Sequence, residues 1–296
     1  MDIVTARTVC ALRHIAKKAS VGGRLLVLQR VLRRLFHGLP VAVRIHDFDG
    51  DLTVDLRLEE HMQSRMFWVE YYNREVVSVL KRLLAPGMVL VDAGANIGEI
   101  AMIAAKRVGA TGEVIAFEPV DELADKLETN IQLNRLHNVR VVRAGLLDST
   151  GTHPIYASSG QTQREENDGL CSLYVGTDAV PIQTIQTTTL DRYVSEQSIR
   201  RVDIIKIDIE GAELACLRGA KETLVRFQPY LIVEVQRHSA AAAGYEQGDI
   251  LDYLASFGYQ FSLIGKKGRL QRISKTDLSD YQNVFCCPPG RLSLAE

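Results

Sequence analysis

Hydrophobic and polar residues alternate with two different periods along most of this chain. Short apolar runs rich in Val, Ile and Leu are followed by longer stretches in which apolar residues recur every third or fourth position. Runs of the first kind predict buried strands, and stretches of the second kind predict amphipathic helices. We expect strands at 88–93, 113–118, 139–144, 202–208, 230–235, 259–264 and 283–287, and helices at 98–108, 122–136, 213–227 and 249–257. This alternation indicates an α/β fold in which a doubly wound, mostly parallel sheet is covered on both faces.

The first part of the chain follows a different pattern. Apolar and polar residues alternate over 41–46 and 52–58 around an Asp49-Gly50 step, which predicts a β-hairpin. Upstream, apolar residues over 25–36 interleave with arginines at helical spacing. We therefore expect an N-terminal helical segment with a β-hairpin over residues 1–64, and an α/β domain over residues 65–296 that begins with a helix at 66–84.

Basic charge is concentrated in this N-terminal segment. The whole chain has 35 Lys and Arg against 36 Asp and Glu, so its net charge gives no reason to expect a nucleic-acid partner. Residues 1–46 nevertheless contain one acid and the basic residues Arg7, Arg13, Lys17, Lys18, Arg24, Arg30, Arg33, Arg34 and Arg44. Either the apolar stripe of this helix packs on the α/β domain, or the helix lies on an anionic membrane surface. A mitochondrial presequence fits this composition less well.

Cysteine usage and hydropathy favour a cytoplasmic protein in a reducing compartment, with peripheral membrane contact left open. The five cysteines are scattered and form no C-x-x-C pair or Cys/His cluster, so we expect no metal centre of the zinc type. No apolar stretch approaches the length of a membrane span. A polar region at 152–188 interrupts the strand–helix rhythm, and it is either a binding loop or an ordinary surface loop.

The most informative motif follows the first strand of the α/β domain. It reads Asp92-Ala-Gly94-Ala95-Asn96-Ile-Gly98 and leads directly into a helical pattern. Glycines allow a ligand to approach the backbone closely, and a helix start offers free N–H groups. The spacing departs from the G-x-G-x-x-G of turns that bind a pyrophosphate, and an acid would repel that group. The motif therefore favours S-adenosylmethionine, which carries an amino group and a sulfonium but no phosphate.

Two further acids end predicted strands of the same sheet, where ligands of such folds bind. Glu118 follows the second strand, at a position where a carboxylate can accept hydrogen bonds from ribose hydroxyls. Lys206, Asp208 and Glu210 alternate at the end of the fourth strand and would point to one side if that strand persists. A buried carboxylate there requires a partner, which could be the donor, an acceptor hydroxyl, Lys206 or a metal.

Taken together, these motifs resemble the FkbM-type S-adenosylmethionine-dependent methyltransferases over roughly residues 67–288. The matching strings occur in the family's order: VDAGANIG (91–98), AFEP (116–119), TLD (189–191), IKIDIEGAE (205–213), LRGA (217–220) and VEV (233–235). The resemblance implies a class I, Rossmann-like methyltransferase fold with seven strands, of which the last is antiparallel. It also implies O-methylation of a sugar or natural-product hydroxyl. Residues 71–75 follow the family's Tyr-Glu pattern only loosely.

We expect the donor site to consist of Asp92, Gly94, Ala95, Asn96, Gly98, Glu118, Ala144 and Asp208. Methyl transfer requires alignment of the reactants in a water-poor site, and a hydroxyl acceptor benefits from a base. The candidates for the base are Asp208, Glu210, Glu234 and His238. A divalent ion held by Asp208 is an alternative that no Asp-Asn pair supports.

The leading hypothesis is thus an O-methyltransferase that acts on a small-molecule or glycan acceptor. One alternative is a methyltransferase-like scaffold without activity, against which the intact acid and glycine positions argue. The other is a nicotinamide-dependent oxidoreductase, against which the absent G-x-G-x-x-G argues.

Overall fold

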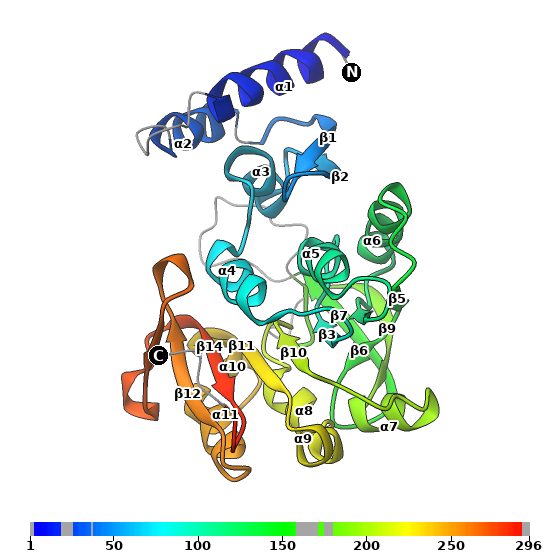
Figure 1. Ribbon diagram of the computed structural model, residues 1–296, viewed down its shortest axis with the longest axis vertical. Coiled ribbons are helices and arrows are strands. Elements are labelled where there is room, and N and C mark those ends of the chain that lie inside the picture. The colour runs from blue at the N-terminus through cyan, green and yellow to red at the C-terminus, as the bar shows by residue number, and fades with distance from the viewer. Residues whose placement is uncertain (1–2, 19–25, 37, 158–170, 175–179, 292–296) are drawn as a thin grey trace.

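A computed structural model describes residues 3–18, 26–36, 38–157, 171–174 and 180–291 of the 296-residue chain (Figure 1). The polar loop expected around residues 157–169 therefore lies almost wholly outside the described residues. Within the described ranges, no helix combines the length and apolar composition that crossing a membrane requires.

A mixed eight-stranded sheet forms the centre of the α/β domain and confirms the expected class I fold. Strands β5, β4, β3, β10 and β11 are parallel, and β14 lies antiparallel between β11 and β12. In sheet order the strands are β13 (Leu270–Arg272), β12 (Gln260–Ile264), β14 (Tyr281–Cys287), β11 (Tyr230–Gln236), β10 (Ile204–Ile207), β3 (Val89–Ala93), β4 (Glu113–Phe117) and β5 (Val139–Val142). The eighth strand, β13, was not predicted because it has three residues, none of them buried.

Two hydrophobic clusters cover the two faces of this sheet. Successive residues of a strand alternate between them, as Leu90 and Val91 of β3 do. One cluster contains α4 (Arg74–Leu83), α5 (Glu99–Val108) and α6 (Asp121–Leu133). The other contains α7 (Leu190–Glu196), α8 (Glu213–Arg218), α9 (Lys221–Phe227) and α11 (Gln247–Ala255), while the short α10 (Arg237–Ala242) follows β11 directly.

A second, four-stranded sheet occupies the region that interrupts the strand–helix rhythm. Its order is β6 (Gly145–Leu146), β9 (Pro181–Thr188), β7 (Gly151–Ala157) and β8 (Cys171–Ser172). The polar region expected at 152–188 therefore contains three short strands, β7, β8 and β9, within its described residues. Because β6 begins three residues after β5 ends, this sheet starts at the carboxyl edge of the central sheet.

The single helix expected over 66–84 is wrong. The structure has two helices, α3 (His61–Val69) and α4, separated by Glu70, whose φ is 78°. The carboxylate of Glu99 accepts hydrogen bonds from the backbone N–H of Tyr72 at 2.7 Å and of Asn73 at 3.3 Å. These N–H groups would be engaged within a continuous helix, so a carboxylate distant in sequence stabilises the break.

The helix expected over 213–227 is also divided. Gly219 follows the last residue of α8, and only glycine fits there because a Cβ atom would lie 2.0 Å from the carbonyl oxygen of Leu147. The carboxylate of Asp191 then accepts the N–H groups of Glu222 and Thr223 at 2.8 and 2.7 Å, which satisfies the first turn of α9. Close packing, rather than any local sequence signal, thus sets this boundary.

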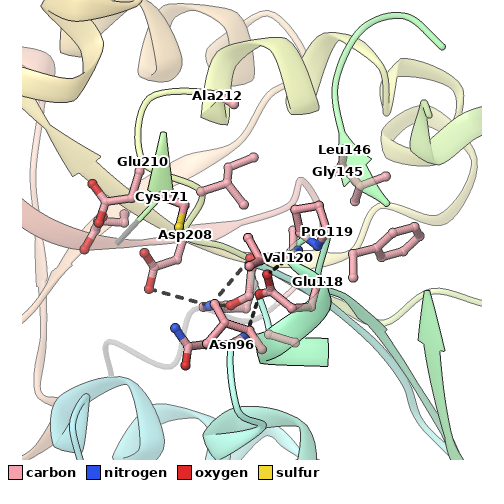
Figure 2. A pocket seen from close by; sticks show the side chains of 18 of the residues that line it. Asn96, Glu118, Pro119, Val120, Gly145, Leu146, Cys171, Asp208, Glu210 and Ala212 are labelled. Atoms are coloured by element: carbon pink, nitrogen blue, oxygen red, sulfur yellow. Dashed lines mark hydrogen bonds and ion pairs between the residues drawn. The ribbon is translucent and has the colours of Figure 1, made fainter. Parts of the chain in front are cut away.

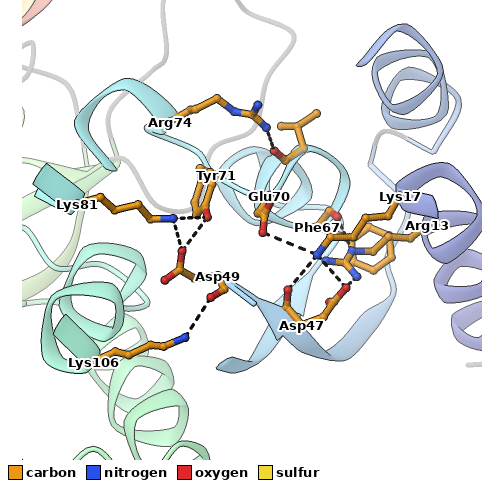
Figure 3. Close-up of polar contacts among 11 residues, drawn as sticks. Arg13, Lys17, Asp47, Asp49, Phe67, Glu70, Tyr71, Arg74, Lys81 and Lys106 are labelled. Carbon is orange, nitrogen blue, oxygen red and sulfur yellow. Dashed lines mark hydrogen bonds and ion pairs between the residues drawn. The ribbon is translucent and has the colours of Figure 1, made fainter. Parts of the chain in front are cut away.

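The N-terminal segment packs on the hairpin of β1 (Ala42–Phe48) and β2 (Leu52–Arg57), which the sequence predicted. Helix α1 (Ile3–Lys18) buries Val9 and Ala16, and helix α2 (Leu26–Leu35) follows it. Two basic side chains of α1 face the hairpin rather than solvent. Arg13 donates to the carbonyl oxygen of Phe67 at 2.7 Å and pairs with Asp47 at 2.6 Å, and Lys17 pairs with Asp47 at 2.9 Å (Figure 3).

Asp49, in the hairpin turn, ties this segment to the α/β domain. Its side chain is 3% exposed and pairs with Arg107 of α5 at 2.9 Å and with Lys81 of α4. It also accepts a hydrogen bond from the hydroxyl of Tyr71 at 2.7 Å (Figure 3). Three elements of the α/β domain therefore converge on one buried carboxylate, and the expected boundary at residue 64 falls inside α3.

We predict that Asp49→Asn lowers the free energy of unfolding by about 2 kcal/mol, because it removes one partner of a largely buried charge cluster. Asparagine keeps the shape of the side chain and tolerates the positive φ of 45° at this position. Asp51→Asn is the matched control, since that carboxylate is 72% exposed and pairs only with Lys106 among the described residues. This control substitution should lower the free energy of unfolding by less than about 0.5 kcal/mol. Urea unfolding at neutral pH measures the stability of both variants. An equal loss of stability in the two variants would show that Asp49 has no special role in joining the hairpin to the α/β domain.

Candidate active site

The glycine turn between β3 and α5 lies directly against the end of β10. Gly94 has a φ of 79°, and a Cβ atom there would lie 2.0 Å from the backbone carbonyl oxygen of Asp208. Gly98 has a φ of 98°, and a Cβ atom there would lie 2.6 Å from the side chain of Leu127. Gly94 is thus required by conformation and by close packing, and Gly98 by its conformation. Asn96, with a φ of 50°, turns the chain between them.

Lys206 of β10 connects this strand to the glycine turn and to the neighbouring strand β3. Its buried ammonium donates a hydrogen bond to the carbonyl oxygen of Gly94 at 2.8 Å. It also pairs with Asp92 at 3.3 Å and with Asp208 at 3.6 Å. Burial opposes the charge, but Asp92 and Asp208 raise the pKa of Lys206 above its ordinary value. Lys206 is therefore the partner that the carboxylates at this strand end require.

The strand that carries Lys206 ends earlier than expected. Strand β10 stops at Ile207, Asp208 follows it, and Glu210 has a φ of 51°. The alternation of Lys206, Asp208 and Glu210 was expected only if the strand persisted through them, and this condition is not met. The three side chains nevertheless line one cavity, because the turn after β10 brings Glu210 back towards it.

Glu118 links the glycine turn to the start of α6. Its carboxylate accepts the N–H of Asn96 at 2.8 Å and the N–H of Val120 at 3.0 Å (Figure 2). A carboxylate has about four acceptor positions, so Glu118 retains acceptor capacity towards the cavity that it lines. Burial, opposed by these hydrogen bonds, raises its pKa to about 7.

A cavity opens beside the turn and brings most of the predicted site together. It is lined by the predicted donor-site residues Gly94, Ala95, Asn96, Glu118, Ala144 and Asp208, and by the candidate base Glu210. Its apolar wall near Glu118 includes Phe117, Val120 and Leu146. Of the remaining predicted residues, Asp92 is completely buried behind the cavity and Gly98 caps α5. His238 is exposed on α10 and does not line the cavity.

At one end of the cavity, three carboxylates come close together. Asp208, Glu210 and Glu234 each offer an oxygen atom, and these atoms lie within 4.8 Å of one another. We call these three residues the acidic trio. Glu234 belongs to β11, the neighbour of β10 in the sheet, and is 6% exposed. Burial and the nearby Asp208 raise the pKa of Glu210 to about 8, and burial, Asp208 and Glu210 raise that of Glu234 well above its ordinary value.

The wall opposite the central sheet comes from a segment that the sequence analysis did not place in the site. Glu60, Met62 and Gln63 at the start of α3 and Tyr72 and Asn73 in the α3–α4 turn line the cavity. The His61 and Tyr72 rings are perpendicular, with centroids 6.2 Å apart, and the Arg65 guanidinium lies 5.2 Å from the centroid of the Tyr72 ring. The only sequence signal for this wall was the aromatic run at residues 71–72, which follows the family pattern loosely.

Several known proteins are similar to this chain. A family model described as the methyltransferase FkbM domain matches residues 92–261. The 2-O-methyltransferase NoeI of Sinorhizobium fredii is 26% identical over 196 residues, which cover 62% of this chain and 77% of NoeI. The AMB antimetabolite synthetase AmbE of Pseudomonas aeruginosa is 24% identical over 274 residues, which cover 82% of this chain and 12% of AmbE.

The chain thus spans only a small part of AmbE. Among solved structures, the methyltransferase FkbM from Methylobacillus flagellatus KT matches with 20% identity and a TM-score of 0.44, covering 67% of this chain and 43% of that one. The family model spans more than half of the chain and includes the glycine turn, Glu118 and the acidic trio. The chain belongs to the FkbM methyltransferase family.

Proposed function

We propose that this protein is an S-adenosylmethionine-dependent methyltransferase that methylates a hydroxyl group of a sugar, glycan or other natural product. One observation supports this most strongly: a single cavity is lined by the glycine turn, by Glu118 and by the acidic trio. A donor held at the turn and an acceptor held at the trio would therefore share one space. The name of the relative NoeI, a 2-O-methyltransferase, agrees with oxygen as the methylated atom.

The charges around the turn suit S-adenosylmethionine better than a dinucleotide. Lys206 already pairs with Asp92 and Asp208, so its charge is not available for a pyrophosphate. The carboxylates near the cavity complement a ligand with a sulfonium and an ammonium group. In this proposal Gly94, Ala95 and Asn96 contact the donor, and Glu118 accepts hydrogen bonds from its ribose. Asp92 and Gly98 shape the turn without lining the cavity.

Residues on both sides of the cavity then position the reaction. S-adenosylmethionine supplies a methyl group bound to a positively charged sulfur. The apolar wall beside Glu118, which includes Ala144, suits an adenine ring, and the wall formed by α3 and Tyr72 limits access of water to the acceptor. Asp208 and Glu210 line the space where a hydroxyl would lose its proton, whereas the exposed position of His238 gives it less support as a base. The proposal includes no metal ion.

The simplest test of the proposed function is mass spectrometry of the purified protein, with calorimetric titration of S-adenosylmethionine and NAD. We expect co-purifying S-adenosylhomocysteine and binding of S-adenosylmethionine but not of NAD. Transfer of a labelled methyl group to a panel of glycosides and hydroxylated natural products then identifies the acceptor. Absence of the co-purifying product together with absence of donor binding would refute the proposal.

We predict that Gly94→Ala abolishes measurable donor binding, because the added methyl group collides with the carbonyl of Asp208 and the residue has a positive φ. Gly109→Ala is the matched control. Gly109 also has a positive φ, of 65°, but a Cβ atom there meets no atom within 4 Å, and the residue does not line the cavity. Isothermal titration of S-adenosylmethionine should therefore give an unchanged dissociation constant for Gly109→Ala. Equal loss of binding in both variants would point to general instability instead.

We predict that Asp208→Asn reduces methyl transfer at least about 100-fold, the scale expected for a group that touches the reacting atoms. Donor binding should survive within about tenfold, because asparagine preserves the shape of the side chain beside Lys206. His238→Ala should retain activity, since that side chain lies outside the cavity. Labelled-methyl transfer measures the first effect and calorimetry the second. Full activity of Asp208→Asn would remove this residue from the reaction.

A further inference from the structure

Within the acidic trio, the carboxylates of Glu210 and Glu234 lie close to each other. What we infer from this pair rests on the proposed function. Glu234 lies within β11 and Glu210 lies in the turn after β10, yet one oxygen atom of each and one of Asp208 lie within 4.8 Å of one another. Both residues line the cavity that the glycine turn also lines. Glu234 is 6% exposed, so water screens the repulsion between these carboxylates poorly.

The positive charge near the pair, on Lys206, already pairs with other carboxylates. Lys206 pairs with Asp92 and Asp208, and among the described residues no Lys, Arg or His nitrogen lies within 4.0 Å of Glu210 or Glu234. The other groups that face the pair are acidic or neutral, apart from one guanidinium behind an aromatic ring. They are Glu213 of α8, Ser239 of α10, Tyr281 of β14, and Tyr72 with Arg65 behind it.

This arrangement has a direct consequence for the ionisation of the pair. Two carboxylates that share a poorly solvated site do not both ionise at low cost, and their protons leave in steps that belong to the pair. The direction of the pKa shifts agrees, since burial and neighbouring carboxylates raise the pKa values of both groups. Asp208 and Glu213 act on Glu210, and Asp208 and Glu210 act on Glu234. The empty cavity therefore favours a state in which a proton remains on the pair.

We propose that Glu210 and Glu234 hold a proton while the cavity is empty and release it when S-adenosylmethionine enters, so that the pair becomes the base for the acceptor hydroxyl only when the donor is bound. The trio lies next to the donor turn, because the backbone of Asp208 packs directly on Gly94. A positive charge within about 4–6 Å of a carboxyl group favours its ionised form. S-adenosylhomocysteine, which lacks the charge on sulfur, should have a weaker effect.

With this pair as the base, every bond, electron pair and proton of the methyl transfer is accounted for. The acceptor oxygen forms the new C–O bond, and the C–S bond breaks with its electron pair left on sulfur. The hydroxyl proton passes to the ionised pair, which then returns to its protonated state as the charge on sulfur disappears. The pair thus loses a proton to solvent when the donor binds and regains one from the acceptor in each cycle.

Calorimetry tests this proposal without an acceptor. The enthalpy of donor binding is measured at pH 7.5 in phosphate and in Tris, two buffers with different ionisation enthalpies, after dialysis against EDTA. We expect S-adenosylmethionine to release a substantial fraction of one proton per site and S-adenosylhomocysteine to release clearly less. Because the donor binds the deprotonated form more tightly, affinity for S-adenosylmethionine should rise with pH between 6 and 9.

Glu210→Gln and Glu234→Gln should each remove most of this proton release while donor binding persists. Glu222→Gln is the matched control, since Glu222 is an exposed acid on α9 that does not line the cavity. If either variant fails to fold, infrared spectroscopy of the other provides the second readout. The band of a protonated carboxylic acid should disappear as the pH of the wild-type protein rises through about 8, and it should be absent from the variant.

Donor binding without proton release would overturn this inference alone, as would equal release by both ligands or release that survives in both variants. Release of the same proton by Mg²⁺ in the absence of donor would also overturn it, because the trio would then be a cation site. Failure of S-adenosylmethionine to bind at all would instead refute the proposed function together with the inference.

Discussion

The buried ammonium of Lys206 is the interaction on which the site depends. It lies opposite Asp92 in the register between β10 and β3, and it reaches the carbonyl of Gly94 and the carboxylate of Asp208. One charge therefore fixes two neighbouring strand ends and the glycine turn between them. Without it, Asp92 and Asp208 would face each other in a medium where an unpaired carboxylate is very costly. The same pairing leaves Glu210 and Glu234 without a cation of their own among the described residues, and burial and neighbouring carboxylates raise the pKa values of both.

The N-terminal segment extends this organisation beyond the residues that match the family model. Residues 92–261 contain the glycine turn and the trio, but the opposite wall of the cavity comes from α3 and the α3–α4 turn. Glu99, at the first position of α5, holds the backbone of Tyr72 and so couples this wall to the glycine turn. Asp49 holds the hairpin to α4 and α5.

Local patterns predicted the central sheet and the glycine turn well because their causes are local. The apolar runs around Val91 and Ile205 form completely buried strands, and Gly94 and Gly98 are required by the turn itself. The breaks at residues 70–73 and 219–220 were missed because their causes, Glu99, Asp191 and Leu147, are distant in sequence. The convergence of Glu234 with Asp208 and Glu210 depends on the order of strands, which no local pattern contains. Likewise, the exposure of His238 follows from the course of α10.

A crystal structure with bound S-adenosylhomocysteine would test the central claim, that one cavity holds the donor at the turn and directs its sulfur towards the acidic trio. The account predicts ribose hydroxyls hydrogen-bonded to Glu118, the amino acid part of the ligand beside Gly94 and Asn96, and the sulfur facing Asp208, Glu210 and Glu234. A ligand bound elsewhere, or one whose sulfur points away from these three carboxylates, would contradict it.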